Sequence, residues 1–155
     1  MLLSKIEQSP NISVFIDRFS TAIGQAWAIV CKRVEFKIRD RIKDALSSGL
    51  LGHEFSANVT KKYSFLINLR GLIDNYISCI EVDIISQKKY SIRVYVNEDH
   101  LENLGLPRDL RDILEFGNED LPNFPHFNKG IDNWVMMDSE ELFRELDATV
   151  GKLMS

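Results

Sequence analysis

Histidine and acidic side chains are the groups in this sequence that could bind a metal ion or transfer a proton. His53, His100 and His126 lie in three separate segments, without the i, i+4 spacing or the neighbouring cysteine pair that zinc sites use. The spacing therefore predicts no metal site. We expect each histidine to be solvated or hydrogen-bonded to groups near it in the sequence.

Carboxylates are dense in the second half of the chain, where Asp99, Glu102, Asp109 and Asp112 could supply a pair for general acid–base catalysis. The same density makes close pairs common by chance. The sequence contains no glycine-rich phosphate loop, no Gly-x-Ser-x-Gly turn and no Cys/His signature of a nucleophile. We therefore expect a protein that is not an enzyme and has no cofactor, and a small hydrolase that uses a histidine is the catalytic alternative.

The two cysteines, Cys31 and Cys79, lie within apolar segments and are expected to be buried, reduced thiols. Residues 1–10 lack the apolar run of about 7 to 15 residues that marks a secretory signal. No stretch approaches the roughly 18 apolar residues of a membrane-spanning helix. We expect synthesis in the cytoplasm and no membrane contact.

At 155 residues, with 45% hydrophobic and 27% charged residues, the chain has the size and composition of one globular domain over residues 1–155. The net charge of −4 excludes a global positive field that would hold the protein on nucleic acid. Residues 1–96 carry 14 basic and 9 acidic side chains, whereas residues 97–155 carry 5 and 14. Two solvated faces of different charge explain this division, and so does head-to-tail contact between copies.

The elements that position these groups begin with a long helix, expected over residues 11–48 between Pro10 and Gly49. Apolar residues recur there at steps of three and four: Phe15, Phe19, Ile23, Trp27, Val30, Val34, Ile38, Ile42 and Ala45. Gly24 could mark a bend or a close approach. The second half of the helix is basic, which fits a solvated, partly self-neutralised face or contact with phosphate or an acidic partner.

A small antiparallel sheet is expected within residues 63–97. Residues 77–86 and 90–96 are rich in β-branched residues with a period of two, which predicts a hairpin with one buried face. The residues between them, Gln87–Lys89, suit a tight connection. Residues 63–76 fit either a helix or a strand.

Residues 49–62 are expected to form a loop, and residues 108–116 a short helix. The next segment, residues 117–130, contains Pro122 and Pro125, which restrict the residues before them to extended conformations. This segment is expected to be an extended arm.

A C-terminal helix is expected over residues 138–154. Asp138, with Glu141 three positions later, resembles a capping box. The apolar stripe of this helix consists of Leu142, Leu146, Val150 and Leu153. Together the elements predict the α+β class, with a long N-terminal helix packed on a small antiparallel β-sheet, an extended loop and a C-terminal helix.

The stretch from Asp112 to Phe127 stands out because an arm rich in proline and aromatic residues leaves a short helix at a glycine. Its large apolar side chains either fold back over the sheet or dock on another subunit. The expected subunit interface consists of Glu115, Phe116, Gly117, Pro122, Phe124, Pro125 and Phe127.

This stretch resembles the head–tail connector and tail-completion proteins of tailed bacteriophages, also called minor tail or neck proteins. Members typically show Glu-Phe-Gly-Thr, a short interval, a Pro-x-x-Pro-Phe-Leu element and a closing helix. Glu115–Gly117 matches the first part, Asn118 stands in place of threonine, and Pro122–Phe127 approximates the proline element with an inserted histidine. The family's Thr-Gly-x-Leu-x-x-Ser-Ile element is reduced to its glycine and its apolar spacing in Arg70–Ile77.

The resemblance implies a non-enzymatic virion protein at the head–tail junction. Such a protein forms a ring, hexameric in this family, that joins the portal or adaptor to the tail tube or tail terminator. DNA would pass through an acidic lumen without specific binding, while the basic helix would face a neighbouring subunit. Outside this family, the alternative is a small cytosolic acidic binding module, similar to an inhibitor or antitoxin, that masks a basic partner.

Overall fold

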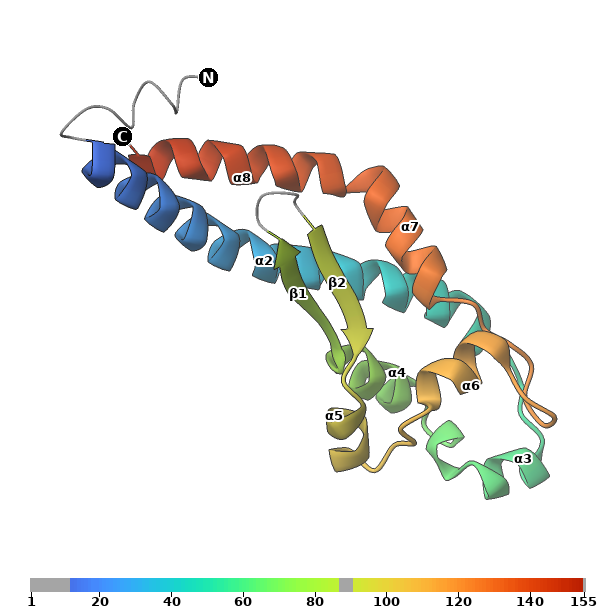
Figure 1. The fold of residues 1–155 in the computed structure, drawn as a ribbon. Helices are drawn as coiled ribbons and strands as arrows, with labels where there is room; N and C mark the ends of the chain where they lie inside the picture. The colour runs from blue at the N-terminus through green and yellow to red at the C-terminus, as the bar shows by residue number, and fades with distance from the viewer. Residues whose placement is uncertain (1–11, 87–90, 155) are drawn as a thin grey trace.

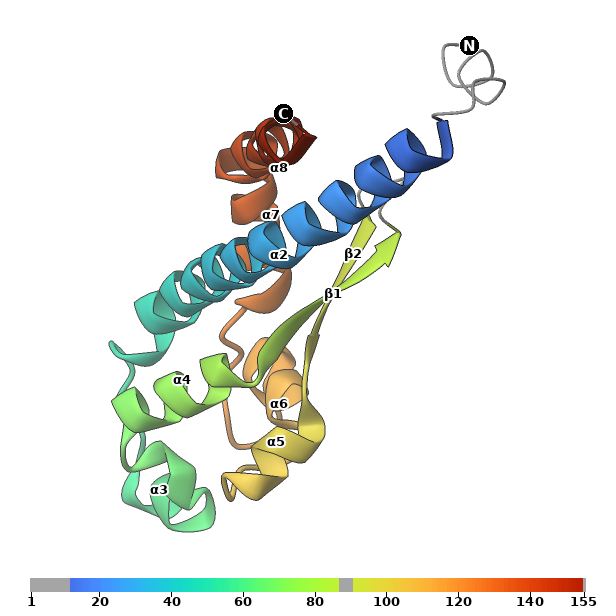
Figure 2. The ribbon, with the colours of Figure 1, turned by 90° about the vertical axis from the view of Figure 1, so that its left-hand side faces the viewer.

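The structure, a computed structural model, describes residues 12–86 and 91–154. The features expected at Pro10, at residue 11 and at the connection Gln87–Lys89 lie outside the described residues. A long helix runs through most of the length of the molecule, and the other elements pack along it or beyond its C-terminal end (Figures 1 and 2).

Helix α2, Ile12–Leu50, contains 39 residues and is therefore about 58 Å long. Its buried face includes Trp27, Ile38 and Ile42, as the periodicity of the sequence predicts. The helix continues without interruption through Gly24, where an added Cβ would meet open space. The long helix is thus confirmed, and Gly24 marks neither a bend nor a close approach.

The predicted end of this helix at residue 48 is wrong. The helix continues through Leu50, whose side chain is fully buried. Gly49 lies inside the last turn, and a Cβ there would lie 3.2 Å from the Phe124 ring. Burial of Leu50 therefore outweighs the preference of glycine for the position after a helix.

The loop predicted over residues 49–62 is also partly wrong. Helix α3, Ala57–Lys62, occupies its second half, and the 3-10 turn η1, Ser64–Leu66, follows. The Ser56 side chain caps α3 by accepting a hydrogen bond from the backbone N–H of Val59. This cap is a local signal for a helix that is too short to show an apolar period.

Residues 63–76, which fit two patterns in the sequence, fold mainly as helix. Helix α4 spans Leu69–Ser78, and the Asn68 side chain caps it by accepting from the backbone N–H of Gly71 at 3.0 Å. Its buried side chains have helical spacing: Leu72, Ile73, Tyr76 and Ile77. The first strand therefore begins later than residue 77.

The predicted antiparallel hairpin is confirmed. Strand β1, Ile80–Ser86, pairs with β2, Ser91–Val96, in a sheet of two strands. Ile80 lies opposite Val96, and the register holds as far as Ile84. β1 packs on α2, which buries one face of the sheet.

Two short helices follow the hairpin, α5 at Glu98–Asn103 and α6 at Leu110–Phe116. α6 confirms the short helix predicted within residues 108–116. α5 was not predicted, and the Asn97 side chain caps it by accepting from the backbone N–H of His100.

The extended arm predicted over residues 117–130 is shorter in the structure. Helix α7, Phe127–Met137, already includes its last residues, because the Glu115 carboxylate binds the backbone at the start of that helix. Helix α8, Ser139–Met154, confirms the predicted C-terminal helix.

Helices α7 and α8 pack along one side of α2, while α4 and β1 pack along another (Figures 1 and 2). The contact between α7 and α2 is closest at Gly130, where an added Cβ would lie 2.5 Å from Ile42 Cγ1. The buried side chains of all these elements form one core. The predicted α+β class, with a long N-terminal helix on a small antiparallel sheet, is confirmed.

Candidate functional site

The Glu115 side chain, near the end of α6, contacts the backbone at the start of α7. Helix α6 and the start of α7 lie toward one end of the molecule (Figure 1). The Oε2 atom of Glu115 accepts hydrogen bonds from the backbone N–H groups of His126 at 3.0 Å and Phe127 at 2.8 Å. These N–H groups open α7 and have no partner within the helix. The buried carboxylate therefore satisfies them and neutralises the positive end of the helix dipole.

Gly117 forms the turn that sends the chain back against α6. It has a φ of 71°, a region that favours glycine, and a Cβ there would lie 2.6 Å from the Leu121 carbonyl oxygen. Asn118 accepts hydrogen bonds from the backbone N–H groups of Asp120 and Leu121, both at 2.9 Å. Glycine and asparagine together close a compact turn.

His126 is fully buried beneath this turn and is therefore not solvated. It is bonded near itself in the sequence, which is the other environment expected for it, and also to a residue 50 positions away. Its Nδ1 lies 2.7 Å from the Phe124 carbonyl oxygen, which can only accept, so Nδ1 carries the proton. Nε2 then accepts from the Tyr76 hydroxyl at 2.5 Å. Burial lowers the pKa of His126, although the adjacent Glu115 opposes this shift, and the ring is therefore neutral.

The Tyr76 hydroxyl donates this hydrogen bond to His126 Nε2. Burial raises the pKa of Tyr76 far above its usual range, so the phenol stays protonated. The sequence does not predict this pair, because the two residues are 50 positions apart and no local pattern connects them.

Two of the three aromatic side chains expected at a subunit interface belong to the core instead. Phe124 is 8% exposed and packs against Phe55 and His53, with ring centroids 6.1 and 5.5 Å apart. Phe127 is 2% exposed, and the Arg111 guanidinium lies 3.7 Å from its ring centroid. Their placement corrects the interface predicted from the sequence, since a buried side chain cannot dock on a second subunit.

Of the seven residues predicted at an interface, Phe116, Pro122 and Pro125 are exposed, and Phe116 is 71% exposed. We call these three residues the tip surface. Glu115 is buried and Gly117 half-buried. The motif therefore divides into residues that fold the segment and residues that remain accessible on it.

The basic half of α2 meets acidic residues of the C-terminal half of the same chain. Asp138 was predicted to cap α8, yet its buried carboxylate accepts a hydrogen bond from Arg41 Nε at 2.9 Å and lies 3.9 Å from Lys37 Nζ. Arg33 forms an ion pair with Glu145 of α8. Part of the opposite charge of the two halves is thus neutralised within one molecule.

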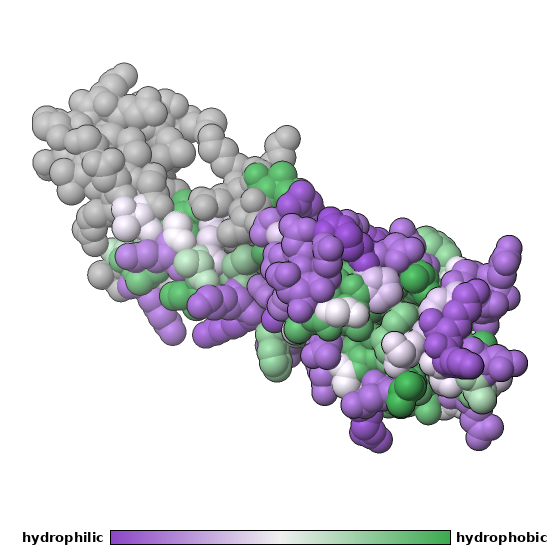
Figure 3. Space-filling model, turned by 90° about the horizontal axis from the view of Figure 1, so that it is seen from below, coloured by the Kyte–Doolittle hydropathy of each residue, from purple (hydrophilic) through white to green (hydrophobic). Residues whose placement is uncertain are grey.

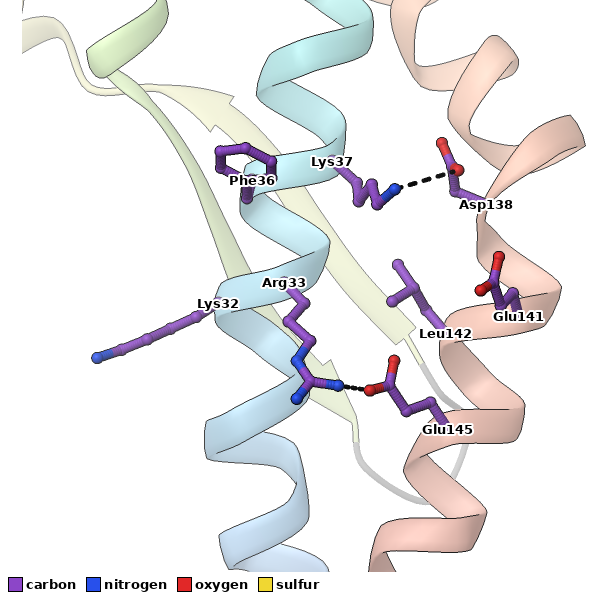
Figure 4. Close-up of a pocket in the computed structure, with 8 residues that line it drawn as sticks. All are labelled: Lys32, Arg33, Phe36, Lys37, Asp138, Glu141, Leu142 and Glu145. Atoms are coloured by element: carbon purple, nitrogen blue, oxygen red, sulfur yellow. Dashed lines mark ion pairs between the residues drawn. The ribbon is translucent and has the colours of Figure 1, made fainter.

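A shallow groove of about 280 Å³ lies between α2 and α8 (Figure 4). Its charged lining contains three basic and three acidic residues: Lys32, Arg33, Lys37, Asp138, Glu141 and Glu145. The Lys32 side chain points away from α8, and the ring of Phe36, which is 69% exposed, lies at the edge of the groove. Asp138 and Glu145 are each bound to cations in these ion pairs, so neither is positioned as a free general base.

Two of the four carboxylates that could have formed a catalytic pair, Asp99 and Glu102, bind one arginine, whereas Asp109 and Asp112 do not. Arg108 binds Asp99 at 2.6 Å, Glu102 at 2.8 Å and Glu98 at 3.3 Å, all on exposed surface. These hydrogen bonds raise the pKa of Arg108. The arrangement is a surface ion network, whose contribution to stability is small for exposed groups.

The remaining candidates are also engaged in the fold. Cys79 is buried and its Sγ donates to the Asn75 carbonyl, while the half-buried Cys31 lies 3.7 Å from the Val82 carbonyl oxygen. Burial raises the pKa of both thiols. His53 stacks edge-on against Phe55 at 4.6 Å.

Within residues 12–86 and 91–154, no three side chains of His, Cys, Asp or Glu come together as a set of metal ligands. Across the same residues, no helix has both the length and the apolar composition needed to cross a bilayer. No protein-family model matches the chain, and neither a curated protein nor a solved structure is detectably similar to it.

Proposed function

We propose that this chain is a structural protein of a tailed phage, a ring-forming head–tail connector or tail-completion component that joins the portal or adaptor to the tail. The proposal rests on the resemblance of residues 112–127 to that family. The observation that supports it best is that some residues of this motif fix the backbone of the segment, while others remain exposed on it. Glu115 and Gly117 hold the segment in one conformation, which leaves the tip surface exposed on a rigid support.

A rigid, exposed aromatic residue is the type of side chain that protein interfaces bury. Phe116 is 71% exposed at the end of α6, on the same helical face as Asp112. Aromatic residues contribute a large area at low entropic cost, because few rotatable bonds are frozen on docking. A neighbouring subunit that covers Phe116 would remove an unfavourable apolar surface from water.

The order of elements supports the proposal in part: members of the family have a long N-terminal helix, a β-meander, the motif and a C-terminal helix, and this chain has a two-stranded hairpin in place of the meander. A long helix, a hairpin, the motif and a closing helix follow one another, and the hairpin and the motif lie on different parts of the molecule (Figure 1). Because many cations of α2 pair within the chain, contact between copies would depend more on apolar surface than on the opposite charges of the two halves.

The acidic residues that remain exposed around α5 and α6 suit a surface facing a DNA channel. Glu98, Asp99 and Glu102 share a single arginine, and Asp109 and Asp112 are also exposed. A channel lined by excess negative charge repels phosphate and lets DNA pass without specific binding. No enzymatic step is part of this function.

The experiment compares Phe116→Ser with Phe36→Ser, since the two phenylalanines have nearly equal exposure on different surfaces. Both substitutions should leave the free energy of unfolding within about 0.5 kcal/mol of the parent. Only Phe116→Ser should reduce incorporation of the chain into phage necks, measured in particles assembled with each variant. Equal incorporation of Phe116→Ser and the parent would contradict a docking role for the tip surface.

The acidic binding module remains the alternative function. It draws on the same exposed carboxylates around Arg108, which could bind a basic partner only by competing with that arginine. Neighbouring genes for portal, capsid and tail proteins would favour the connector, whereas a single toxin gene would favour the module.

A further inference from the structure

Strand β2 has a free edge in a sheet of only two strands (Figure 1). The register of the hairpin shows which backbone groups form this edge. Asn97 N–H donates to the Cys79 carbonyl at 2.7 Å, and this pair continues the register that places Ile80 opposite Val96. In an antiparallel ladder, hydrogen-bonded and non-hydrogen-bonded pairs alternate.

The alternation divides the residues of each strand into two sets. The backbone N–H and C=O groups of one set point toward the partner strand, and those of the other set point away from it. Tyr95 and Arg93 bond to β1, so Ile92, Val94 and Val96 direct their N–H and C=O groups away from β1. Within the described part of the chain, none of these outward groups has a hydrogen-bond partner. Such an edge is a template for another strand.

The outer edge of β1, by contrast, lies on α2 and is occupied. The Ile80 carbonyl accepts from Arg39 Nε at 2.8 Å, and the Val82 carbonyl faces Cys31 Sγ at 3.7 Å. These are outward carbonyls by the same alternation, which supports the assignment independently. Only β2 can therefore accept a further strand.

The sequence of β2 contains few of the devices that block strand addition, and Arg93 is its single charged residue. The strand has no proline, glycine or lysine, and the irregularity of the ladder lies at Ile84 and Ser86, at the other end of the hairpin from Val96. Four of its six residues are β-branched or aromatic. Beside its C-terminal end, an open hollow of about 370 Å³ lies between Tyr95 and Arg111 of α6 and leaves room for an incoming chain.

We propose that β2 pairs with β2 of a second copy of this chain, antiparallel and about a two-fold axis at Val94. The outward residues then meet one another: Val94 faces Val94, and Ile92 faces Val96 on each side of the axis. Each facing pair exchanges two hydrogen bonds. The two hairpins become one four-stranded sheet with β1 at both ends.

The side chains favour this register over its neighbours. With the axis at Val94, Arg93 of one copy lies opposite Tyr95 of the other, and an arginine already stacks on that ring within the chain at 4.4 Å. Moving the axis to Arg93 would place two arginines opposite each other, which is unfavourable. It would also leave fewer outward residues paired.

This pairing does not depend on the proposed function. A two-fold contact of one surface with itself closes as a dimer. The pairing joins two copies in solution, whatever larger assembly the chain enters. A chain that is absent from phage necks could still form it, and a neck protein could lack it.

The first test is disulfide cross-linking of Val94→Cys under mild oxidation. Facing residues of a hydrogen-bonded pair have Cα atoms about 5.5 Å apart, within the range that a disulfide spans. We expect a covalent dimer for Val94→Cys and none for Ile85→Cys, which is 64% exposed on β1. The parent, which contains only Cys31 and Cys79, supplies the baseline. Equal cross-linking of the two variants would overturn the proposal.

The second test is sedimentation equilibrium of the parent and of Val94→Pro. The Val94 N–H points away from β1, so proline removes an edge donor without breaking the β1–β2 ladder. We expect a dimer in the parent and a dissociation constant raised about tenfold or more in the variant. A parent that stays monomeric up to about 1 mM, or a monomer that binds the strand of another protein at β2, would overturn pairing between copies. If Val94→Pro does not fold, the cross-linking result decides.

Discussion

The Tyr76 hydroxyl donates a hydrogen bond to His126 Nε2 across 2.5 Å, which ties α4 to the turn that precedes α7. The same histidine ring binds the Phe124 carbonyl, and its backbone N–H binds Glu115. Three segments of the chain, at Tyr76, at Glu115 and at Phe124–His126, thus meet at one buried polar group. The motif that resembles a phage family is held in place from within the molecule by this group.

Replacing the donor should cost stability. Tyr76→Phe leaves His126 Nε2 buried without a partner, and an unsatisfied buried acceptor costs about 1 to 3 kcal/mol. The free energy of unfolding in urea measures the loss. Tyr95→Phe is the matched control, because the Tyr95 hydroxyl binds Glu81 on more exposed surface and its loss should cost less. Equal losses for the two variants would contradict the proposed importance of the buried pair.

Acid should weaken the fold through His126. Burial lowers the pKa of this histidine in the folded state, so below the unfolded value of about 6.5 the unfolded chain binds more protons. Stability is therefore complete above that pH and is lost as the pH falls towards the lowered pKa, by at most about 1.4 kcal/mol per pH unit from this group. Urea unfolding between pH 7 and pH 5 measures the slope. His126→Gln should show a smaller slope, and an unchanged slope would contradict this account.

The negative charge of Glu115 should contribute to the free energy of unfolding in addition to the hydrogen bonds that its side chain accepts. Glu115→Gln retains an oxygen that can accept from Phe127 N–H but loses the negative charge at the start of α7. We expect a loss of about 1 to 2 kcal/mol, because the site is buried. Glu119→Gln, on the exposed turn, should change the free energy of unfolding by less than about 0.5 kcal/mol. A neutral effect of Glu115→Gln would show that the hydrogen bond alone suffices.

Substitutions at two glycines with positive φ distinguish the cost of backbone strain from the cost of a steric clash. Gly105 and Gly117 have φ values of 75° and 71°, but only at Gly117 would a Cβ meet backbone atoms, at 2.6 Å. Gly105→Ala should cost about 1 kcal/mol from strain alone. Gly117→Ala should cost clearly more and should displace the tip surface, as thermal unfolding and limited proteolysis of the turn would measure. Equal losses of stability in the two variants would mean that the backbone around Gly117 shifts to accommodate a Cβ, which contradicts this prediction.

The sequence predicts the elements that have a long or regular apolar period. Helix α2, helix α8 and the hairpin follow from steps of three to four or of two residues. Helices α3 and α5 have six residues each, too few to show a period, and their only local signals are the caps at Ser56 and Asn97. The end of α2 lies two residues beyond the predicted one because Leu50 is buried in the core, and no local pattern shows this burial.

The candidate site was predictable in position but not in the role of each residue. Aromatic residues beside prolines fit both the core and an interface, and only the fold shows that Phe124 and Phe127 are buried while Phe116 is not. The role of Glu115 as a cap for α7 requires the chain to turn back at Gly117. The contact between Tyr76 and His126 depends on the tertiary fold, and no local sequence pattern predicts it.

Electron microscopy of assembled phage particles, with an antibody fragment against this chain, tests the proposed function most directly. We predict label in a ring at the head–tail junction, between the portal vertex and the tail, and particles that lose this label when Phe116→Ser replaces the parent. Label elsewhere on the particle, or particles that contain no copy of the chain, would contradict a connector role.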